Sequence, residues 1–476
     1  MSNRRSIFSG LFWKFSERIF AQLITFVVSI VLARLLTPSH YGSIALLNVF
    51  IAIANVFVIS GLGNSLIQKK DADDLDFSSV FFFNIVISCL MYLILFILAP
   101  SISRFYNEPL LSPVLRILGL RLILAGVNSV QQAYVSKQMI FKKFFWATFW
   151  GSLISGVLGI LAAYNGFGIW SLVIQNLSNA TIDTIVLWFT VKWRPVIKFS
   201  IERIKLLFTY GWKLLVSALL DTGYLQLRSL IIGKVFTSSD LAFYNRGEQF
   251  PQLIVNNINA SINTVLFPAI SSVQDDRKKV KAMTRRAIKT SSFIMWPMMM
   301  GMIVLASPIV ELVLTDKWLS SVIYMQIACI VYGFWPIHTA NLQAIKAIGR
   351  SDVFLKLEVI KKTFGVLLII FSIKFGVLAI AVSGIVSTIF SSFINAFPNK
   401  EFIDYGYMDQ IRDIIPSFGL SVIMALIIYP FKYVFYSNIL LIFIQVMTGT
   451  CVYILLSYLF KIESFRYLTN LLTNKK

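Results

Sequence analysis

The feature that most constrains this chain is a succession of apolar segments, each about 20 residues long. An α-helix of that length spans the hydrocarbon core of a bilayer, whereas an isolated strand leaves its backbone groups unsatisfied in lipid. The fold class is therefore predicted to be an all-α integral membrane protein. About 14 transmembrane helices are expected, near residues 12–35, 41–65, 79–100, 113–136, 144–164, 168–190, 207–234, 241–270, 288–313, 320–345, 354–373, 376–397, 412–434 and 438–460.

Composition and charge placement agree with a membrane protein. Apolar residues make up 57% of the chain and charged residues 14%, and the mean hydropathy is +0.76. A soluble chain could not bury that much apolar surface. The net charge of +21 could indicate nucleic-acid binding, but most Lys and Arg residues gather in alternate connecting segments. The positive-inside rule then places both termini in the cytoplasm, and no nucleic acid is expected as a partner.

A turn that recurs about 200 positions later indicates an internal repeat. Residues 30–42 end one apolar segment and begin another, and residues 231–240 resemble them, with Arg34 matching Lys234 and Thr37 matching Thr237. Similar offsets relate three other pairs: Trp13-Lys14 and Trp212-Lys213, Phe167-Gly168-Ile169 and Phe375-Gly376-Val377, and Gln132-Ala133 and Gln343-Ala344. Six spans per half is an even number, so both halves enter the membrane from the same side. Two six-helix lobes related by a pseudo-two-fold axis along the membrane normal are predicted.

The repeat defines the predicted domains. Residues 1–200 form an N-lobe with helices 1–6, and residues 201–402 form a C-lobe with helices 7–12. Residues 403–476 lie outside the repeat and supply two additional transmembrane helices and a basic cytoplasmic tail.

Polar residues form matching stripes on spans one and seven. Both stripes follow helical spacing, and an offset of 199 relates them position by position. A charge at the bilayer centre costs about 2.5–3.5 kcal/mol, so the stripes are expected to face protein or water. Two interpretations stay open: a cationic cavity between the lobes, or ion pairs that join helices. The candidate cavity residues, which include others on span eight, are Lys14, Glu17, Arg18, Gln22, Lys213, Asp221, Arg228, Arg246, Asn256 and Asn263.

Other polar residues have more specific expected roles. Asp183 and Asp221 are candidates for coupling to an ion, H⁺ or Na⁺, although the amides near them are equally suited to hydrogen bonds between helices. Arg34 and Lys234 are candidate gate residues. Arg121 and Lys346 are weaker cavity candidates, and structural roles are expected for His40, His338 and the cysteines 89, 329 and 451.

No residue is predicted to be catalytic or to bind a metal. The chain has no GxxxxGK[ST], HExxH or GxSxG motif, and no connecting segment exceeds about 25 residues, which leaves no room for a catalytic domain. The protein is therefore expected not to be an enzyme and to need no cofactor beyond the coupling ion.

The first turn, Leu32-Ala33-Arg34-Leu35-Leu36-Thr37-Pro38 followed by Tyr41-Gly42, closely resembles that of the Wzx-type polysaccharide flippases, and of their WzxC-like subgroup in particular. These form the polysaccharide transporter branch of the MOP exporter superfamily. The family usually has an acidic residue where His40 stands. Further matching pieces, over residues 8–355, are Ser60-Gly61-Leu62-Gly63, Arg104-Phe105-Tyr106, Trp193-Arg194-Pro195, Ile231-Ile232-Gly233, Leu266-Phe267-Pro268-Ala269 and Gly349-Arg350.

The resemblance implies a MATE- and MurJ-like fold in the bacterial inner membrane. It implies a flippase that moves polyprenyl-pyrophosphate-linked oligosaccharide units to the outer leaflet by alternating access. The expected partners are this lipid-linked substrate, membrane lipids, a polysaccharide polymerase and glycosyltransferases. Lys14, Arg18, Lys213 and Arg228 would then face the pyrophosphate.

Two other functions stay open. One is an ion-coupled exporter of small molecules with the same fold. The other is a membrane polysaccharide polymerase or ligase, although such enzymes usually have a large outer loop and the connections here are short.

Overall fold

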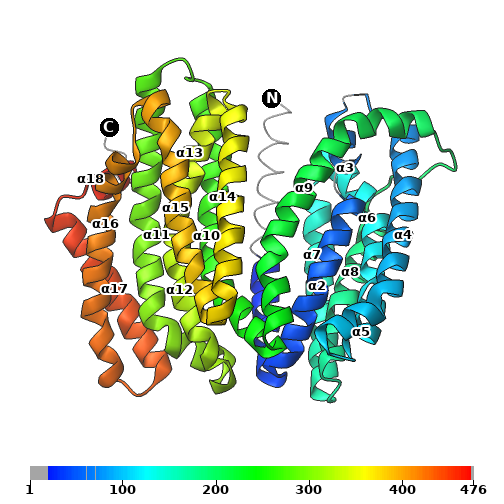
Figure 1. Ribbon diagram of the computed structural model, residues 1–476, viewed down its shortest axis with the longest axis horizontal. Helices are drawn as coiled ribbons and strands as arrows, with labels where there is room; N and C mark the ends of the chain where they lie inside the picture. The colour runs from blue at the N-terminus through cyan, green and yellow to red at the C-terminus, as the bar shows by residue number, and fades with distance from the viewer. Residues whose placement is uncertain (1–19, 60–61, 70, 473–476) are drawn as a thin grey trace. The chain divides into compact units, whose positions relative to one another are not determined.

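The computed structural model describes residues 20–59, 62–69 and 71–472, and the secondary structure in these ranges is helical throughout (Figure 1). Contacts divide the chain into two compact units, Met1–Ala242 and Phe243–Lys476, which we call unit 1 and unit 2. Unit 1 holds the helix Phe20–Leu35, the beginning of α10, and α2 (Pro38–Ile59), α3 (Leu62–Gln68), α4 (Asp74–Tyr106), α5 (Leu111–Leu118), α6 (Leu120–Lys137), α7 (Lys142–Tyr164), α8 (Ile169–Thr190) and α9 (Ile201–Val235).

Unit 2 contains the remaining helices. These are the rest of α10 (Ser238–Ser271), α11 (Arg277–Leu314), α12 (Val322–Gly333), α13 (Trp335–Ala347), α14 (Ser351–Ser372), α15 (Val377–Ile403), α16 (Tyr407–Ile428), α17 (Asn438–Leu459) and α18 (Glu463–Leu472). Three short 3-10 helices join them, at Asp316–Ser321, Ile373–Phe375 and Tyr429–Tyr433.

The membrane spans follow the predicted pattern. Within the described ranges, eleven helices are long and apolar enough to cross a membrane. Three expected spans fall outside that set. The first is described only as the short helix Phe20–Leu35, because residues 12–19 lie outside the described ranges. The other two are α8 and α14, which have 22 residues each but carry more polar side chains.

Local structure recurs where the sequence predicts a repeat. At both turns the helix ends at residue 35 or 235, and the next helix begins at Pro38 or Ser238. Gly168 before α8 and Gly376 before α15 both have positive φ, +54° and +94°. This backbone region favours glycine because it has no Cβ.

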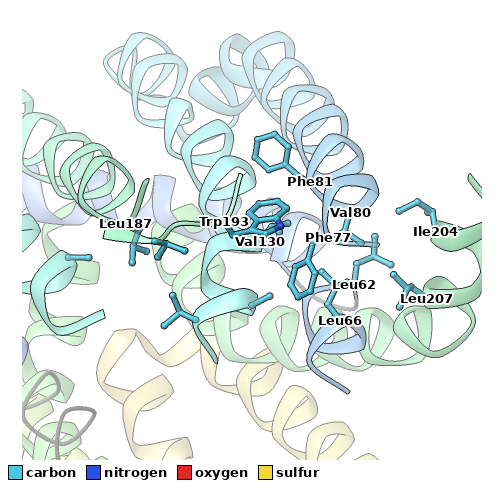
Figure 2. Packing of buried hydrophobic residues seen from close by; sticks show 14 residues of the cluster. Leu62, Leu66, Phe77, Val80, Phe81, Val130, Leu187, Trp193, Ile204 and Leu207 are labelled. Carbon is cyan, nitrogen blue, oxygen red and sulfur yellow. The ribbon is translucent and has the colours of Figure 1, made fainter. Parts of the chain in front are cut away.

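Aromatic and aliphatic side chains from several helices form the core of unit 1 (Figure 2). Phe77 and Phe81 of α4 pack with Trp193, which lies in the segment after α8. The Trp193 indole also donates a hydrogen bond to Asp74, with 3.2 Å between Nε1 and Oδ1. This cluster fixes α4, α6 and α8 against each other, and those helices carry most of the polar residues described below.

The contact boundary differs from the predicted domain boundary. The units divide after Ala242, whereas the repeat predicts a division after residue 200. The difference is mainly α9, which contacts α2, α3 and α4 and contributes Ile204 and Leu207 to the unit 1 core. The sequence repeat and the spatial contacts divide the chain by different criteria. The two lobes that the repeat defines therefore stay a prediction.

Candidate functional site

A polar cavity of about 200 Å³ lies within unit 1, between α2, α6 and α8. Each of these helices is otherwise largely apolar. The polar side chains that line the cavity are Asn55 from α2, Arg121, Asn128 and Gln132 from α6, and Asn179, Asp183 and Thr184 from α8. Polar groups in membrane helices are costly unless they face protein or water, so their gathering in one cavity marks a candidate site.

Asp183 is the carboxylate of this cavity. On α8, Asn179 and Asp183 are one helical turn apart and therefore share a face, as the sequence spacing predicts. Asn128 of α6 donates a hydrogen bond to Asp183, with 2.8 Å between Nδ2 and Oδ2. This bond offsets part of the cost of placing a carboxylate among transmembrane helices.

Arg121 supplies a positive charge to the same cavity. Its guanidinium donates a hydrogen bond to Asn176 of α8, with 3.1 Å between Nη1 and Oδ1. Asn176 and Asp183 are seven residues apart, about 10 Å along the helix axis. The cavity thus holds one cation and one carboxylate that are separated rather than paired.

Two amide oxygens near the carboxylate are buried without a hydrogen-bond partner. They are Oδ1 of Asn55 and Oδ1 of Asn128, and no described residue donates to either. Carboxylate and amide oxygens are the ligands that hard cations prefer. Among the residues that the structure describes, no group of three or more His, Cys, Asp or Glu side chains could hold a metal ion. The cavity thus brings one carboxylate and two unpartnered amide oxygens together, and a coupling ion, H⁺ or Na⁺, stays a prediction.

The predicted cavity residues of spans one, seven and eight lie in different parts of the chain. Lys14, Glu17 and Arg18 lie outside the described residues, and Gln22 lies on the helix Phe20–Leu35. Lys213, Asp221 and Arg228 lie on α9 of unit 1, whereas Arg246, Asn256 and Asn263 lie on α10 of unit 2. A cavity shared by these two sets stays a prediction.

Several polar residues of unit 2 bond to neighbouring helices. Gln343 of α13 donates to Asn263 (2.6 Å), and Thr339 donates to Asn259 (3.0 Å). Arg246 is 6% exposed and lies 5.1 Å from the centre of the Trp318 ring. The two amide bonds correspond to the alternative that the sequence left open for the amides, hydrogen bonds between helices.

The two repeated turns lie against each other within unit 1. A Cβ built on Gly42 would lie 1.7 Å from the carbonyl oxygen of Ser238, so only glycine permits this approach. Glu108, between α4 and α5, accepts hydrogen bonds from Ser43 and from Ser238, the latter at 2.9 Å. We call Gly42, Ser43, Glu108 and Ser238 the Glu108 clasp.

The gate candidates flank this clasp. Arg34 and Lys234 are both exposed and belong to unit 1. The Lys234 ammonium lies 4.0 Å from the centre of the Phe105 ring and donates to the Phe105 carbonyl. The structure thus brings the two turns together, and their role as a gate stays a prediction.

Sequence reasoning missed some of these residues. Asn55, Asn128 and Asn176 are amides within largely apolar segments, and Glu108 is a lone acidic residue in a short connection. The available signal was the polar character of the amides inside predicted spans. Their partners depend on how neighbouring helices are rotated, which the sequence of one helix does not determine.

Similar proteins are found for most of the chain. It is 23% identical over 363 residues to "Lipopolysaccharide biosynthesis protein WzxC" of Escherichia coli (strain K12), covering 76% of this chain and 74% of that protein. It is also 23% identical over 352 residues to "Succinoglycan biosynthesis transport protein ExoT" of Rhizobium meliloti (strain 1021), covering 74% and 71%.

The fold is that of a solved flippase structure. The chain matches "Lipid II flippase MurJ, inward closed conformation" with a TM-score of 0.76 and 16% identity, over 96% of this chain and 100% of that one. Residues 31–323, more than half of the sequence, match the family described as "Polysaccharide biosynthesis protein". The chain therefore belongs to the polysaccharide biosynthesis protein family.

Proposed function

We propose that this protein is a flippase that moves lipid-linked oligosaccharide units, precursors of a surface polysaccharide, across the bacterial inner membrane by alternating access. The observation that carries the proposal is the family match over residues 31–323 on a flippase-like, all-helical fold. Relatives named for lipopolysaccharide biosynthesis and for succinoglycan transport support a glycan substrate. A polysaccharide polymerase and glycosyltransferases are the proposed functional partners.

Transport of such a substrate requires that its charged headgroup be compensated in a low dielectric. Moving an unpaired charge into the bilayer centre costs several kcal/mol, so a carrier must supply opposite charge along the path. The cationic residues of α9, Lys213 and Arg228, are proposed to serve this purpose together with Lys14 and Arg18. Pyrophosphate is the proposed anion because paired cations hold phosphate oxygens well.

We further propose that Asp183 couples transport to proton movement. Arg121 and Asp183 line the same cavity, where their opposite charges attract each other. Protonation of Asp183 removes this attraction and leaves Arg121 as an uncompensated cation in the cavity. A proton binds to the carboxyl through a single O–H bond, whereas Na⁺ needs several oxygen ligands, so H⁺ is the better candidate of the two ions.

A complementation experiment tests both proposals. Deletion of the gene should abolish surface polysaccharide and cause lipid-linked units to accumulate in the inner leaflet, and the wild-type chain should restore export. Asp183→Asn should lower the export rate at least tenfold, because the amide cannot take up and release a proton. Asn165→Asp, at the exposed end of α7, is a control that should export normally.

Two outcomes would contradict these proposals separately. Normal surface polysaccharide in the deletion strain, together with altered tolerance of small toxic compounds, would favour a small-molecule exporter. Full export by Asp183→Asn at unchanged protein level would remove the proton-coupling role but leave the flippase function intact.

A further inference from the structure

A basic pocket lies within unit 2, away from the polar cavity described above. It has a volume of about 340 Å³, which lies in the range of small-molecule sites, about 300–1,000 Å³. The first half of α11 supplies Arg285, Arg286 and Lys289, and α18 supplies Ser464, Tyr467 and Asn470. The two helices are far apart in the sequence, so the pocket is a product of the tertiary fold.

Helical spacing places these side chains on the sides of α11 and α18 that line the pocket. On α11, Lys289 lies three and four positions after the adjacent Arg286 and Arg285, and on α18 the polar residues are three positions apart, so each set lies on one side of its helix. The other side of α18 carries Phe465 and Leu468, which pack on a cluster with Phe293 and Tyr453. This packing holds α18 in place, with its polar face toward the pocket.

The cations of the pocket outnumber the carboxylates that they contact. Arg285 makes a bidentate contact with Asp413, with both N–O distances at 2.8 Å. Lys289 contacts Asp413 at 3.3 Å and also donates to Glu463. Three cations therefore face two carboxylates, which leaves an excess of one positive charge.

Arg286 carries that excess charge. Its guanidinium lies 4.7 Å from the centre of the Tyr467 ring, and no carboxylate among the described residues pairs with it. Stacking on the ring holds the planar guanidinium in position while its N–H groups stay available. Ser464 adds a hydroxyl: it is 3% exposed, lines the pocket, and has no side-chain hydrogen-bond partner among the described residues.

We propose that this pocket binds a phosphate group. A phosphate offers several oxygen acceptors and a negative charge, which match the donors of Arg286, Ser464 and Asn470 and the excess positive charge. The group can come from the headgroup of an anionic phospholipid or from a soluble phosphate ester. Because α18 directly follows α17, a candidate membrane span, the pocket lies next to a span end, where lipid headgroups are concentrated.

The test measures lipid binding to the full chain in detergent micelles by native mass spectrometry. The probe is phosphatidylglycerol, and phosphatidylcholine is the zwitterionic control. Arg286→Ala should weaken phosphatidylglycerol binding about fivefold, the effect of one Lys or Arg near an anionic surface. Lys278→Ala is the matched control, since Lys278 is an exposed cation on the same helix outside the pocket.

Several outcomes distinguish the site from a general effect of surface charge. Equal weakening by Arg286→Ala and Lys278→Ala, or equal binding of the two lipids by the wild-type chain, would overturn the proposal. Ser464→Ala is a second variant that keeps every charge, and it should weaken phosphatidylglycerol binding by a smaller factor. If Ser464→Ala binds phosphatidylglycerol as the wild type does, the Ser464 hydroxyl does not donate a hydrogen bond to the phosphate. That result would contradict the proposed site.

Competition identifies the source of the phosphate. Displacement of phosphatidylglycerol by millimolar inorganic phosphate or glycerol 3-phosphate would assign the pocket to soluble phosphate compounds. Retention of the lipid under those conditions would assign it to a membrane headgroup. Glycan export is not measured, so the result is independent of the proposed flippase function.

Discussion

At the scale of single residues, the Glu108 clasp makes the sharpest prediction. Gly42→Ala places a Cβ within 1.7 Å of the backbone oxygen of Ser238, and backbone cannot rotate away as a side chain can. We expect the two turns to separate and the free energy of unfolding to fall by about 1–3 kcal/mol, the usual cost of overpacking. The midpoint of thermal unfolding in detergent measures this change.

Gly223→Ala is the control for that substitution. Gly223 lies within α9 and nothing lies within 4 Å of a Cβ built there. Alanine is about 0.5–1 kcal/mol better than glycine inside a helix, so this variant should be as stable as the wild type or slightly more stable. Equal stability of Gly42→Ala and Gly223→Ala would show that the turns are not in tight contact.

At the scale of elements, the attachment of α18 to α11 depends on pH. The Lys289 ammonium donates a hydrogen bond to Glu463 and thereby lowers the pKa of that carboxyl below its ordinary value of 4.5. A lowered pKa means that the contact stabilises the folded state above pH 4.5 and is lost as the pH falls through the lowered pKa. Glu463 is largely exposed, so the effect is modest.

Hydrogen exchange of the α18 amides, corrected for intrinsic rates, measures this attachment. In the wild type, protection should be constant from pH 8 to pH 6 and should fall in acid below pH 4.5. Glu463→Gln should show reduced protection already at pH 7 and little further loss in acid, whereas Glu202→Gln in the first turn of α9 should behave as the wild type. An identical pH profile for both variants would contradict the role of Glu463.

At the scale of the whole molecule, charge placement predicts the topology. The connection around Lys137, Lys142 and Lys143 is basic, whereas the connection between α4 and α5 contains Glu108 and no cation. By the positive-inside rule, the first lies in the cytoplasm and the second outside, with both termini in the cytoplasm.

Reporter fusions test this topology. Alkaline phosphatase inserted after residue 108 should be active, because it folds only outside the cytoplasm, and the same insertion after residue 139 should be inactive. A green fluorescent protein at the C-terminus should fluoresce. Activity after residue 139, or a dark C-terminal fusion, would reverse the predicted orientation.

The sequence by itself determined the all-helical class, the positions of most spans, the repeated turn and the family. These are consequences of local properties: the length of apolar runs, the need of every backbone group for a partner in lipid, and short motifs such as Thr37-Pro38. It also singled out Asp183, because a carboxylate in an apolar helix is unusual wherever its neighbours lie.

Only the tertiary structure decided which polar groups meet. Asn128 bonds to Asp183, Asn55 lies in the cavity beside them, and two serines bond to Glu108. Each of these contacts joins residues that are distant in the sequence. The same holds for α9, which the repeat assigns to the second half but which packs on α2, α3 and α4. The reason is physical: in a chain this apolar, almost any helix face can pack against another, so the rotation and pairing of helices are set by close fit, as between Gly42 and Ser238, and not by a pattern within one helix.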